Sequence, residues 1–180
     1  MIEKLPPLAM FQCSPEAGPF TLPVDTIQGM FGGTIAAVSL PASFAPHPCL
    51  FASLAHETGG HDVLHADPGL LGELKEKVAQ KFPDYGELWA YWMDETAADV
   101  YGLLNYGPSY TYCMAFAFSA INTAYGSKEL LHLDSYSSYG TLDVHPTDVL
   151  RLGLAIGALN SMTLSPVRCK PRFSHALRGM

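Results

Sequence analysis

The spacing of prolines and glycines is the feature that most restricts the fold of this chain, because it limits how long any helix can be. Breaks fall at 41–48 (PASFAPHP), at 67–69 (Asp-Pro-Gly), at Pro83, at 107–108 (Gly-Pro) and at Pro146. Proline inside a helix removes a hydrogen bond and clashes with the preceding turn, so each break ends a helix. The part of the chain after residue 48 therefore predicts a series of short helices.

Apolar periodicity between these breaks predicts five helices, over 49–65, 70–82, 87–106, 110–125 and 146–162. The second has an apolar stripe with charged residues opposite it, which is typical of a surface helix. The fourth is nearly all apolar and aromatic, so we expect it to be a central buried helix. In the fifth we expect Pro146 at the first helical position and Asp148 in the first turn. The basic tail from residue 165 is expected to pack loosely.

The N-terminal third contains the β structure that the sequence predicts. Residues 1–29 are rich in proline and glycine and indicate loops and short extended pieces, whereas 34–40 (TIAAVSL) reads as a strand between Gly33 and Pro41. The predicted fold class is mainly α (α+β), with a small N-terminal β element. A length of 180 residues favours one domain, spanning 1–180.

Composition excludes several classes of protein. With 48% apolar residues the chain is not disordered, and a formal net charge of -7 argues against a nucleic-acid partner. The uncharged stretches 26–56 and 100–127 contain helix breakers and polar residues, so no transmembrane span is expected. Prolines near the N-terminus do not fit a signal peptide, and we expect a cytoplasmic protein. The separated cysteines Cys13, Cys49, Cys113 and Cys169 form no Cys-x-x-Cys motif, which favours buried thiols.

The segment from His56 to His61 (HETGGH) carries the clearest chemical signal. It is similar to His-Glu-x-x-His, in which two histidines four apart on a helix bind zinc and the glutamate acts as the base. Here the spacing is five, and an ordinary helix would turn the second imidazole away from the first. One extra residue taken up as a π-type bulge would realign them. Gly59 and Gly60 lie where that distortion is needed, and glycine tolerates it best.

His-Glu-x-x-Gly-His resembles the zinc motif of the dipeptidyl peptidase III family, whose second motif is approximately Glu-Glu-x-x-Ala-Glu/Asp. Residues 94–99 (DETAAD) match that second motif except at Asp94. The resemblance implies that His56, His61 and Glu95 bind zinc and that Glu57 is the catalytic base. It implies that Asp94 and Asp99 orient the histidines, as metal-bound imidazoles generally require.

Glu-x-x-Ala-Asp at 95–99 also resembles the third-ligand helix of other peptidases that complete a two-histidine site with glutamate, so the likeness is to a zincin-like, gluzincin domain. His145-Pro146 followed by Arg151 is similar to a downstream segment of Ste24/HtpX-type peptidases. The resemblance covers about 45 residues plus this short segment. It therefore does not extend to the two-lobed fold or the dipeptide-releasing specificity of dipeptidyl peptidase III.

Two assignments at this site stay open in the sequence. His61 and His65 are four apart, so a site of His61, His65 and an acid is the alternative; the other role for His65 is to interact with the last carbonyls of its helix. The donor that stabilises the oxyanion is His145, Tyr139 or Tyr136, in that order. The predicted strand 34–40 is a candidate edge for backbone pairing with an extended substrate. His47, His132 and His175 are expected to be structural or surface residues.

These residues predict a zinc-dependent peptidase that acts on a peptide or protein substrate. Two other classes of function remain. One is a non-catalytic zinc-binding domain, which peptide turnover would distinguish. The other is a helical protein-interaction domain without metal, favoured by the aromatic surplus and low charge, which metal analysis would distinguish. The substrate, endo- or exo-specificity and oligomeric state are not encoded in these motifs.

Overall fold

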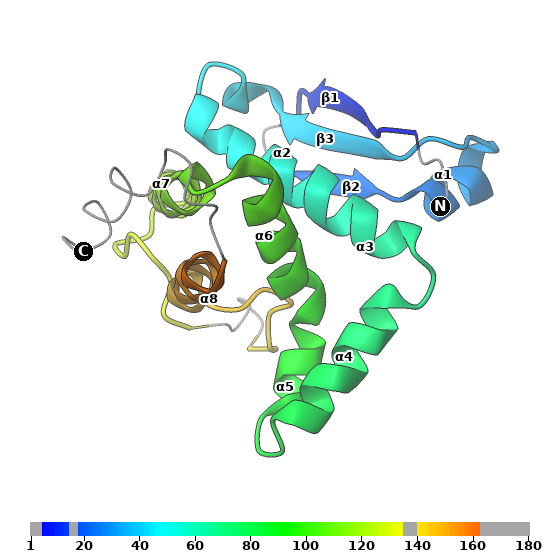
Figure 1. The fold of residues 1–180 in the computed structure, drawn as a ribbon. Coiled ribbons are helices and arrows are strands. Elements are labelled where there is room, and N and C mark those ends of the chain that lie inside the picture. Colours follow the sequence, from blue (N-terminus) through cyan, green and yellow to red (C-terminus); the bar gives the residue numbers. More distant parts are fainter. Residues whose placement is uncertain (1–4, 15–17, 135–139, 163–180) are drawn as a thin grey trace, which may run out of the picture.

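A computed structural model describes residues 5–14, 18–134 and 140–162 of the chain. The fold is mainly helical with a small three-stranded sheet at the N-terminus, as the sequence predicted. The sheet lies on one side of the helices, and the hairpin of α4 (Leu70–Lys81) and α5 (Gly86–Tyr91) projects away from it (Figure 1). The apolar stripe predicted over 70–82 thus lies on α4.

The sheet has the strand order β1-β3-β2. The central strand β3 (Ala37–Pro41) pairs in parallel with β1 (Leu8–Gln12) and antiparallel with β2 (Phe20–Leu22). The predicted strand 34–40 is therefore present, but its expected role as a free edge is wrong, because both of its edges are paired. The helix α1 (Val24–Phe31) was not expected from a segment predicted as loops and extended pieces.

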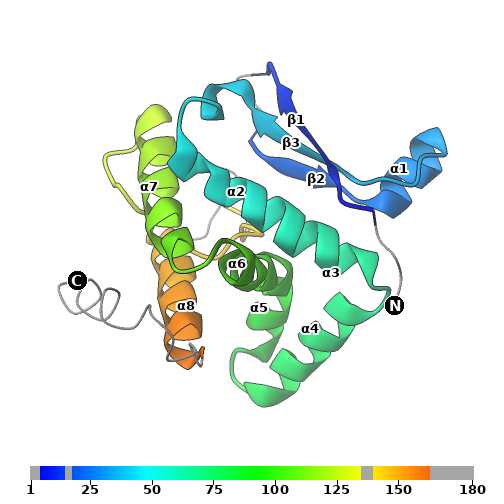
Figure 2. The same ribbon diagram turned by 45° about the horizontal axis from the view of Figure 1, so that its top comes forward.

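A helical path runs beneath the sheet from residue 48 to residue 66 (Figure 2). It comprises the 3-10 turn η2 (Pro48–Phe51), α2 (Ala52–Ala55), a π-helical segment η3 (His56–His61) and α3 (Asp62–Ala66). The short 3-10 turn η1 (Ala42–Phe44) precedes it within the predicted proline-broken loop. The predicted π-type distortion at the histidine motif is thus confirmed.

The helix predicted over 87–106 is interrupted, so the prediction of one helix is wrong. α5 ends at Tyr91 and α6 (Met93–Tyr106) begins after Trp92, which has non-helical dihedral angles. Trp92 is buried, and its indole N–H donates a hydrogen bond to the backbone oxygen of Asp143, 3.0 Å away. The break directs this side chain toward the loop that precedes the last helix.

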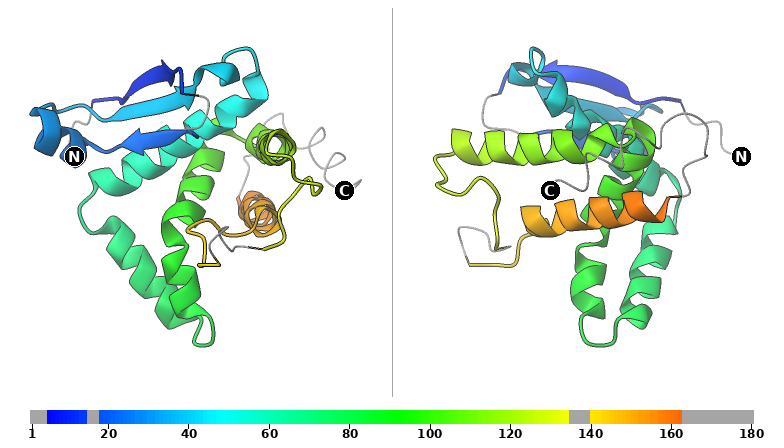
Figure 3. Two further views of the ribbon diagram at one scale, coloured as in Figure 1. Left: turned by 180° about the vertical axis from the view of Figure 1, so that it is seen from behind. Right: turned by 60° about the vertical axis from the view of Figure 1, so that its left-hand side comes forward.

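Helices α7 (Ser109–Ala124) and α8 (Asp148–Ser161) lie side by side next to α6 (Figure 3). The prediction that α7 is a central buried helix is wrong, because Tyr112 and Phe116 are exposed on its outer face. Helix α8 begins at Asp148 rather than at Pro146. Thr147 is its N-cap and accepts a hydrogen bond from the backbone N–H of Leu150.

Two small apolar clusters hold these helices together. The larger joins α2, α6, α7 and α8 and consists of Ala52, Ala55, Leu103, Tyr110, Met114, Ala155 and Leu159. The smaller joins α3 and α6 through Leu64, Ala97 and Ala98. Both clusters include α6, so this helix positions the histidine-bearing segment relative to α7 and α8.

The cysteine prediction is wrong in part. Cys13 and Cys49 are exposed and Cys113 is half-buried, all three as free thiols, and Cys169 lies outside the described residues, as does the predicted basic tail. Within the described part of the chain, no helix has both the length and the apolar character needed to cross a membrane.

Candidate metal centre

The π-helical segment packs directly on α6, and Gly60 makes this possible. A β-carbon at Gly60 would lie 2.5 Å from both Cα and Cβ of Ala98, closer than real side chains approach. The described glycines with a positive φ do not include Gly59 or Gly60. The glycine pair therefore serves close approach between the two helices, in addition to the tolerance of distortion that the sequence indicated.

The two histidines of this segment face one carboxylate. His56 Nε2 lies 3.3 Å from Glu95 Oε2, and His61 Nε2 lies 3.3 Å from Glu95 Oε1. The two imidazole rings are 4.7 Å apart between centroids and nearly perpendicular. The six-residue π-helical turn thus compensates for the five-residue spacing, and both Nε2 atoms lie close to the same glutamate of α6.

The other ring nitrogen of each histidine is held by an aspartate of α6. His56 Nδ1 lies 2.8 Å from Asp99 Oδ1, and His61 Nδ1 lies 3.1 Å from Asp94 Oδ1. A carboxylate at Nδ1 fixes the orientation of the ring and leaves Nε2 available for a ligand. These are the two aspartates to which the family resemblance gave an orienting role.

Asp99 has further partners that sequence reasoning missed. Arg151 donates from Nε to Asp99 Oδ2 at 2.7 Å and from one terminal nitrogen to Asp99 Oδ1 at 2.9 Å, and the Tyr110 hydroxyl donates to Oδ1 at 3.0 Å. All three side chains are buried. The available signal for Arg151 was its position as the one cation within the apolar 149–159 segment, although the sequence analysis used it only for a family likeness. Tyr110 gave no comparable signal.

Burial and charge act in opposite directions on these groups. Burial alone would raise the pKa of Asp99, but the Arg151 guanidinium and His56 hold that pKa well below its usual range. Burial would likewise raise the pKa of Glu95, and its contacts with His56 and His61 hold it low. Burial lowers the pKa of His61, yet Asp94 and Glu95 outweigh this effect and raise it to about 10. At neutral pH these shifts favour the charged carboxylates of Glu95 and Asp99 and the protonated form of His61.

Glu57 lies between the two histidines in sequence and is also buried. Its Oε2 accepts a hydrogen bond of 2.7 Å from the hydroxyl of Thr21, which belongs to strand β2. This contact links the sheet to the site. Nothing in the motif pointed to Thr21, because it is 36 residues away in sequence and becomes a neighbour only through the fold.

His145 also reaches the site. Its Nε2 lies 3.5 Å from Glu95 Oε2, and its Nδ1 lies 2.8 Å from Asp143 Oδ1. This is the third histidine here with an aspartate at Nδ1 and with Nε2 toward Glu95, but it is half-exposed whereas His56 and His61 are more enclosed. The other two oxyanion candidates, Tyr136 and Tyr139, lie outside the described residues.

His65 lies in the last turn of α3, where the sequence placed it, and it also contacts α6. Its Nε2 lies 3.2 Å from Asp94 Oδ2, so His61, His65 and Asp94 also form a group able to hold a metal. His61 Nε2, however, faces Glu95. This orientation favours the site of His56, His61 and Glu95 over the alternative with His65.

The donor atoms fit a divalent metal ion. One donor atom each from His56, Glu57 and His61 lies within 4.8 Å of the others, and Glu95 touches both imidazoles. Among the described residues, Glu95 Oε2 is buried and accepts no hydrogen bond of good geometry, although the side chains of His56, His145 and Arg151 lie 3.3, 3.5 and 3.6 Å from it. A buried carboxylate oxygen is costly unless it is bound, and two imidazoles with a carboxylate are a common ligand set for zinc.

Comparison with known proteins gives no further guidance: no family model, no curated protein and no solved structure matches this chain.

Proposed function

We propose that this protein is a zinc-dependent peptidase with His56, His61 and Glu95 as the metal ligands. The observation that carries the proposal is the approach of both histidine Nε2 atoms, at 3.3 Å, to the two oxygens of the Glu95 carboxylate. When bound here, zinc would act as a Lewis acid and would lower the pKa of a water molecule enough for it to lose a proton near neutral pH. The remaining steps belong to side chains of the chain itself.

Glu57 is the proposed general base. It directly follows one ligand, is buried, and its Oε2 is held by Thr21, so one of its two oxygens is positioned by the protein. Glu57 takes the proton of the attacking water and then delivers it to the departing amine. His145 is the proposed donor to the carbonyl oxygen of the scissile bond. Its half-exposed position lets it meet a substrate entering from solvent.

The sheet provides a place for an extended substrate. One edge of β2 pairs with β3, and among the described strands nothing pairs with its other edge. Phe20 and Thr21 of β2 line a hollow of about 240 Å³ together with Glu57, His61 and His145. A peptide that adds to a free strand edge forms backbone hydrogen bonds whatever its side chains. We therefore assign to β2 the substrate-pairing role that the sequence analysis gave to residues 34–40.

Metal analysis and peptide turnover together test this function. We expect about one zinc per wild-type chain and hydrolysis of a peptide library that a chelator abolishes and added zinc restores. Glu57→Gln should keep the metal and lose turnover by a factor of about 10² to 10⁴. Glu95→Gln and His61→Ala should lose the metal.

Glu73→Gln is the matched control for the glutamate variants. Glu73 is exposed on α4 and pairs with Lys77, so this change should alter neither metal content nor turnover. Turnover that persists in Glu57→Gln would reject Glu57 as the base. If the protein binds zinc but hydrolyses no peptide, it is a non-catalytic zinc-binding domain. If it binds no metal, the remaining alternative is a helical protein-interaction domain.

A further inference from the structure

A second hollow adjoins the candidate metal centre. It has a volume of about 500 Å³, within the range of small-molecule sites, and His56, Glu57, Glu95 and His145 line one part of it. A ligand with its reacting group at these residues would extend into this cavity. The cavity therefore bears on which substrate the proposed peptidase accepts, and the inference below rests on that proposed function.

One face of α7 forms an apolar wall of the cavity. The wall consists of Met114, Ala117, Phe118 and Ile121, which are spaced i, i+3, i+4 and i+7 and so lie on one face of the helix. Phe118 is held in place by Arg151, whose guanidinium carbon lies 4.9 Å from the centre of its ring. Phe44 and Ala52 add further apolar surface.

The carboxylates that line the same cavity disfavour an acidic ligand. They include Asp134, Asp143 and Asp148. Asp143 is bonded to His145, and Asp148 accepts hydrogen bonds from the Asn122 side chain and the backbone N–H of His132, each at 2.8 Å. Two of these acids are thus engaged within the protein rather than available to a cationic side chain, while their charge still repels a carboxylate.

We propose that this cavity receives one large apolar side chain of the substrate, on a residue that flanks the scissile bond. The chain is accordingly selective for peptides with leucine, methionine or phenylalanine at that position. Burial of such a side chain against the α7 wall supplies the binding energy. Glycine leaves the wall uncovered, and aspartate or glutamate meets both the apolar surface and the negative charge.

Peptides that differ only at the two residues flanking the scissile bond test this selectivity. At one of the two positions we expect kcat/KM for phenylalanine or leucine to exceed that for glycine by about 10- to 100-fold, with aspartate lowest. Ile121→Trp, which fills the cavity, should reduce the ratio of kcat/KM for the phenylalanine peptide to kcat/KM for the glycine peptide by at least about fivefold. The zinc content should stay the same. Equal rates for all side chains, or a preference for lysine, arginine or aspartate, would overturn the proposal.

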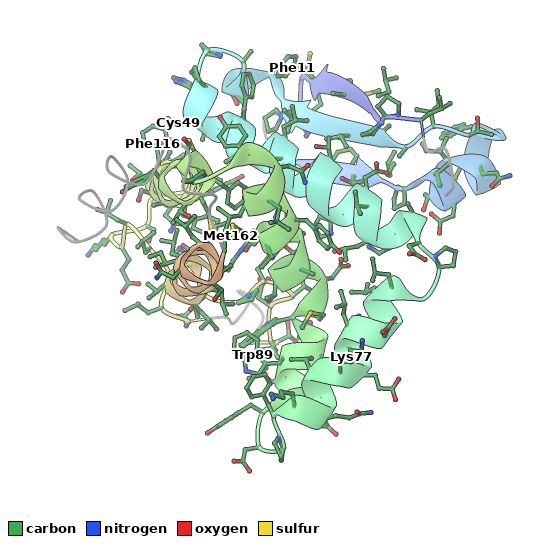
Figure 4. The ribbon with its side chains drawn as sticks, viewed as in Figure 1. Phe11, Cys49, Lys77, Trp89, Phe116 and Met162 are labelled. Carbon is green, nitrogen blue, oxygen red and sulfur yellow. The ribbon has the colours of Figure 1, made fainter. Side chains whose placement is uncertain are left out.

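Phe116→Trp is the matched control on the same helix. Phe116 points outward from α7 and is exposed (Figure 4), so this change should leave the profile unaltered. A ratio that falls equally in both variants would show a general effect on the helix and would also contradict the proposal. Should Ile121→Trp not fold, the wild-type profile and the binding assay below still decide the question.

A binding assay separates this proposal from the proposed function. Zinc-loaded Glu57→Gln protein is titrated with phenylalanine hydroxamate and with glycine hydroxamate, which share the metal-binding group. We expect the phenylalanine probe to bind about 10-fold or more tightly. Tighter binding without peptide hydrolysis by wild type would reject the peptidase and keep the cavity as a site for an apolar group. Hydrolysis without side-chain preference would reject the cavity and keep the peptidase, and absence of metal would reject both.

Discussion

His56 Nδ1 lies 2.8 Å from Asp99 Oδ1, and the same aspartate is bound by Arg151 through two hydrogen bonds. One buried carboxylate thus orients a proposed metal ligand and balances the charge of a buried guanidinium. His61 has a simpler partner, because Asp94 is only half-buried and bonds to His61 and His65. The two aspartates therefore offer a comparison between an orienting group that also supports the fold and one that does not.

Asp99→Asn should lower both metal affinity and stability. The amide is a weaker acceptor for the imidazole, and loss of an orienting partner typically costs 10- to 100-fold in metal affinity. It also removes the nearest countercharge of the buried Arg151, which then keeps only the more distant Glu95 Oε2, 3.6 Å from its guanidinium. We expect this loss to cost about 3 kcal/mol in the unfolding free energy of the metal-free protein. Isothermal titration with zinc and urea denaturation measure the two effects.

Asp94→Asn is the matched comparison for that change. It should weaken zinc binding by a similar factor but destabilise the fold much less, because Asp94 has no buried guanidinium as partner. Equal loss of stability in the two variants would contradict the role assigned to the Asp99–Arg151 pair.

Gly60→Ala should disturb the site through packing alone. The new methyl group would meet the backbone and side chain of Ala98 at 2.5 Å, so the π-helical segment must move away from α6. We expect destabilisation of about 1–3 kcal/mol together with weaker zinc binding, because the histidines and Glu95 lie on the two helices that separate. Thermal denaturation and zinc titration provide the measurements.

The control for Gly60→Ala is Gly72→Ala in α4. A β-carbon at Gly72 meets nothing within 4 Å, so alanine there should stabilise the helix by about 0.5–1 kcal/mol. Helix propensity alone favours alanine at both positions, so equal effects of the two changes on stability would contradict the role assigned to the contact with Ala98.

The site was more predictable from the sequence than the fold around it. The convergence of His56 and His61 and the π-helical bulge could be predicted because a residue spacing converts directly into an angle on a helix, and Gly59-Gly60 marked where the helix departs from that angle. Glu95 entered only through the resemblance to a family motif. By contrast, the break at Trp92 has no glycine or proline. Trp92, at the break, donates a hydrogen bond to the backbone oxygen of Asp143, which is 51 residues away, and no local pattern predicts such a contact.

Long-range contacts account for the other errors. The outer residues of α7, such as Tyr112 and Phe116, are apolar, so periodicity could not distinguish an exposed face from a buried one. The order of the strands could not be read from residues 34–40, because any apolar strand is compatible with a central or an edge position until its neighbours are known. Thr21 contacts Glu57 only because β2 lies beside the π-helical segment.

Zinc binding should release protons at neutral pH. In the metal-free protein the pKa of His61 is raised to about 10, against an ordinary value of 6.5, and that of His56 is also raised. Both imidazoles must lose their protons to bind a metal, so we expect about one to two protons per zinc at pH 7. Titration calorimetry in buffers of different ionisation enthalpy gives this number, and a value near zero would contradict the protonated state.

The same shift predicts how the stability of the metal-free protein depends on pH. A histidine whose pKa is higher in the folded state contributes stability that is fully present below the unfolded pKa and is lost as pH rises through the folded one. The contribution of His61 should therefore decline between pH 6.5 and about 10. Urea denaturation in the presence of a chelator should show this decline. In His61→Gln the free energy of unfolding should decline less over the same pH range. A decline equal to that of the wild type would show that other groups cause it.

His145→Ala should reduce turnover without removing the metal. The side chain is held by Asp143 at Nδ1 and directs Nε2 toward Glu95 from the exposed side of the site, which suits a donor to the substrate carbonyl better than a permanent ligand. Loss of one such donor typically lowers kcat by about 10² to 10³. We expect zinc content to stay at the wild-type level and KM to change little, whereas His47→Ala, at an exposed position before η2, should change neither. Loss of zinc in His145→Ala would instead indicate that His145 is a fourth metal ligand and would contradict its role as the donor to the oxyanion.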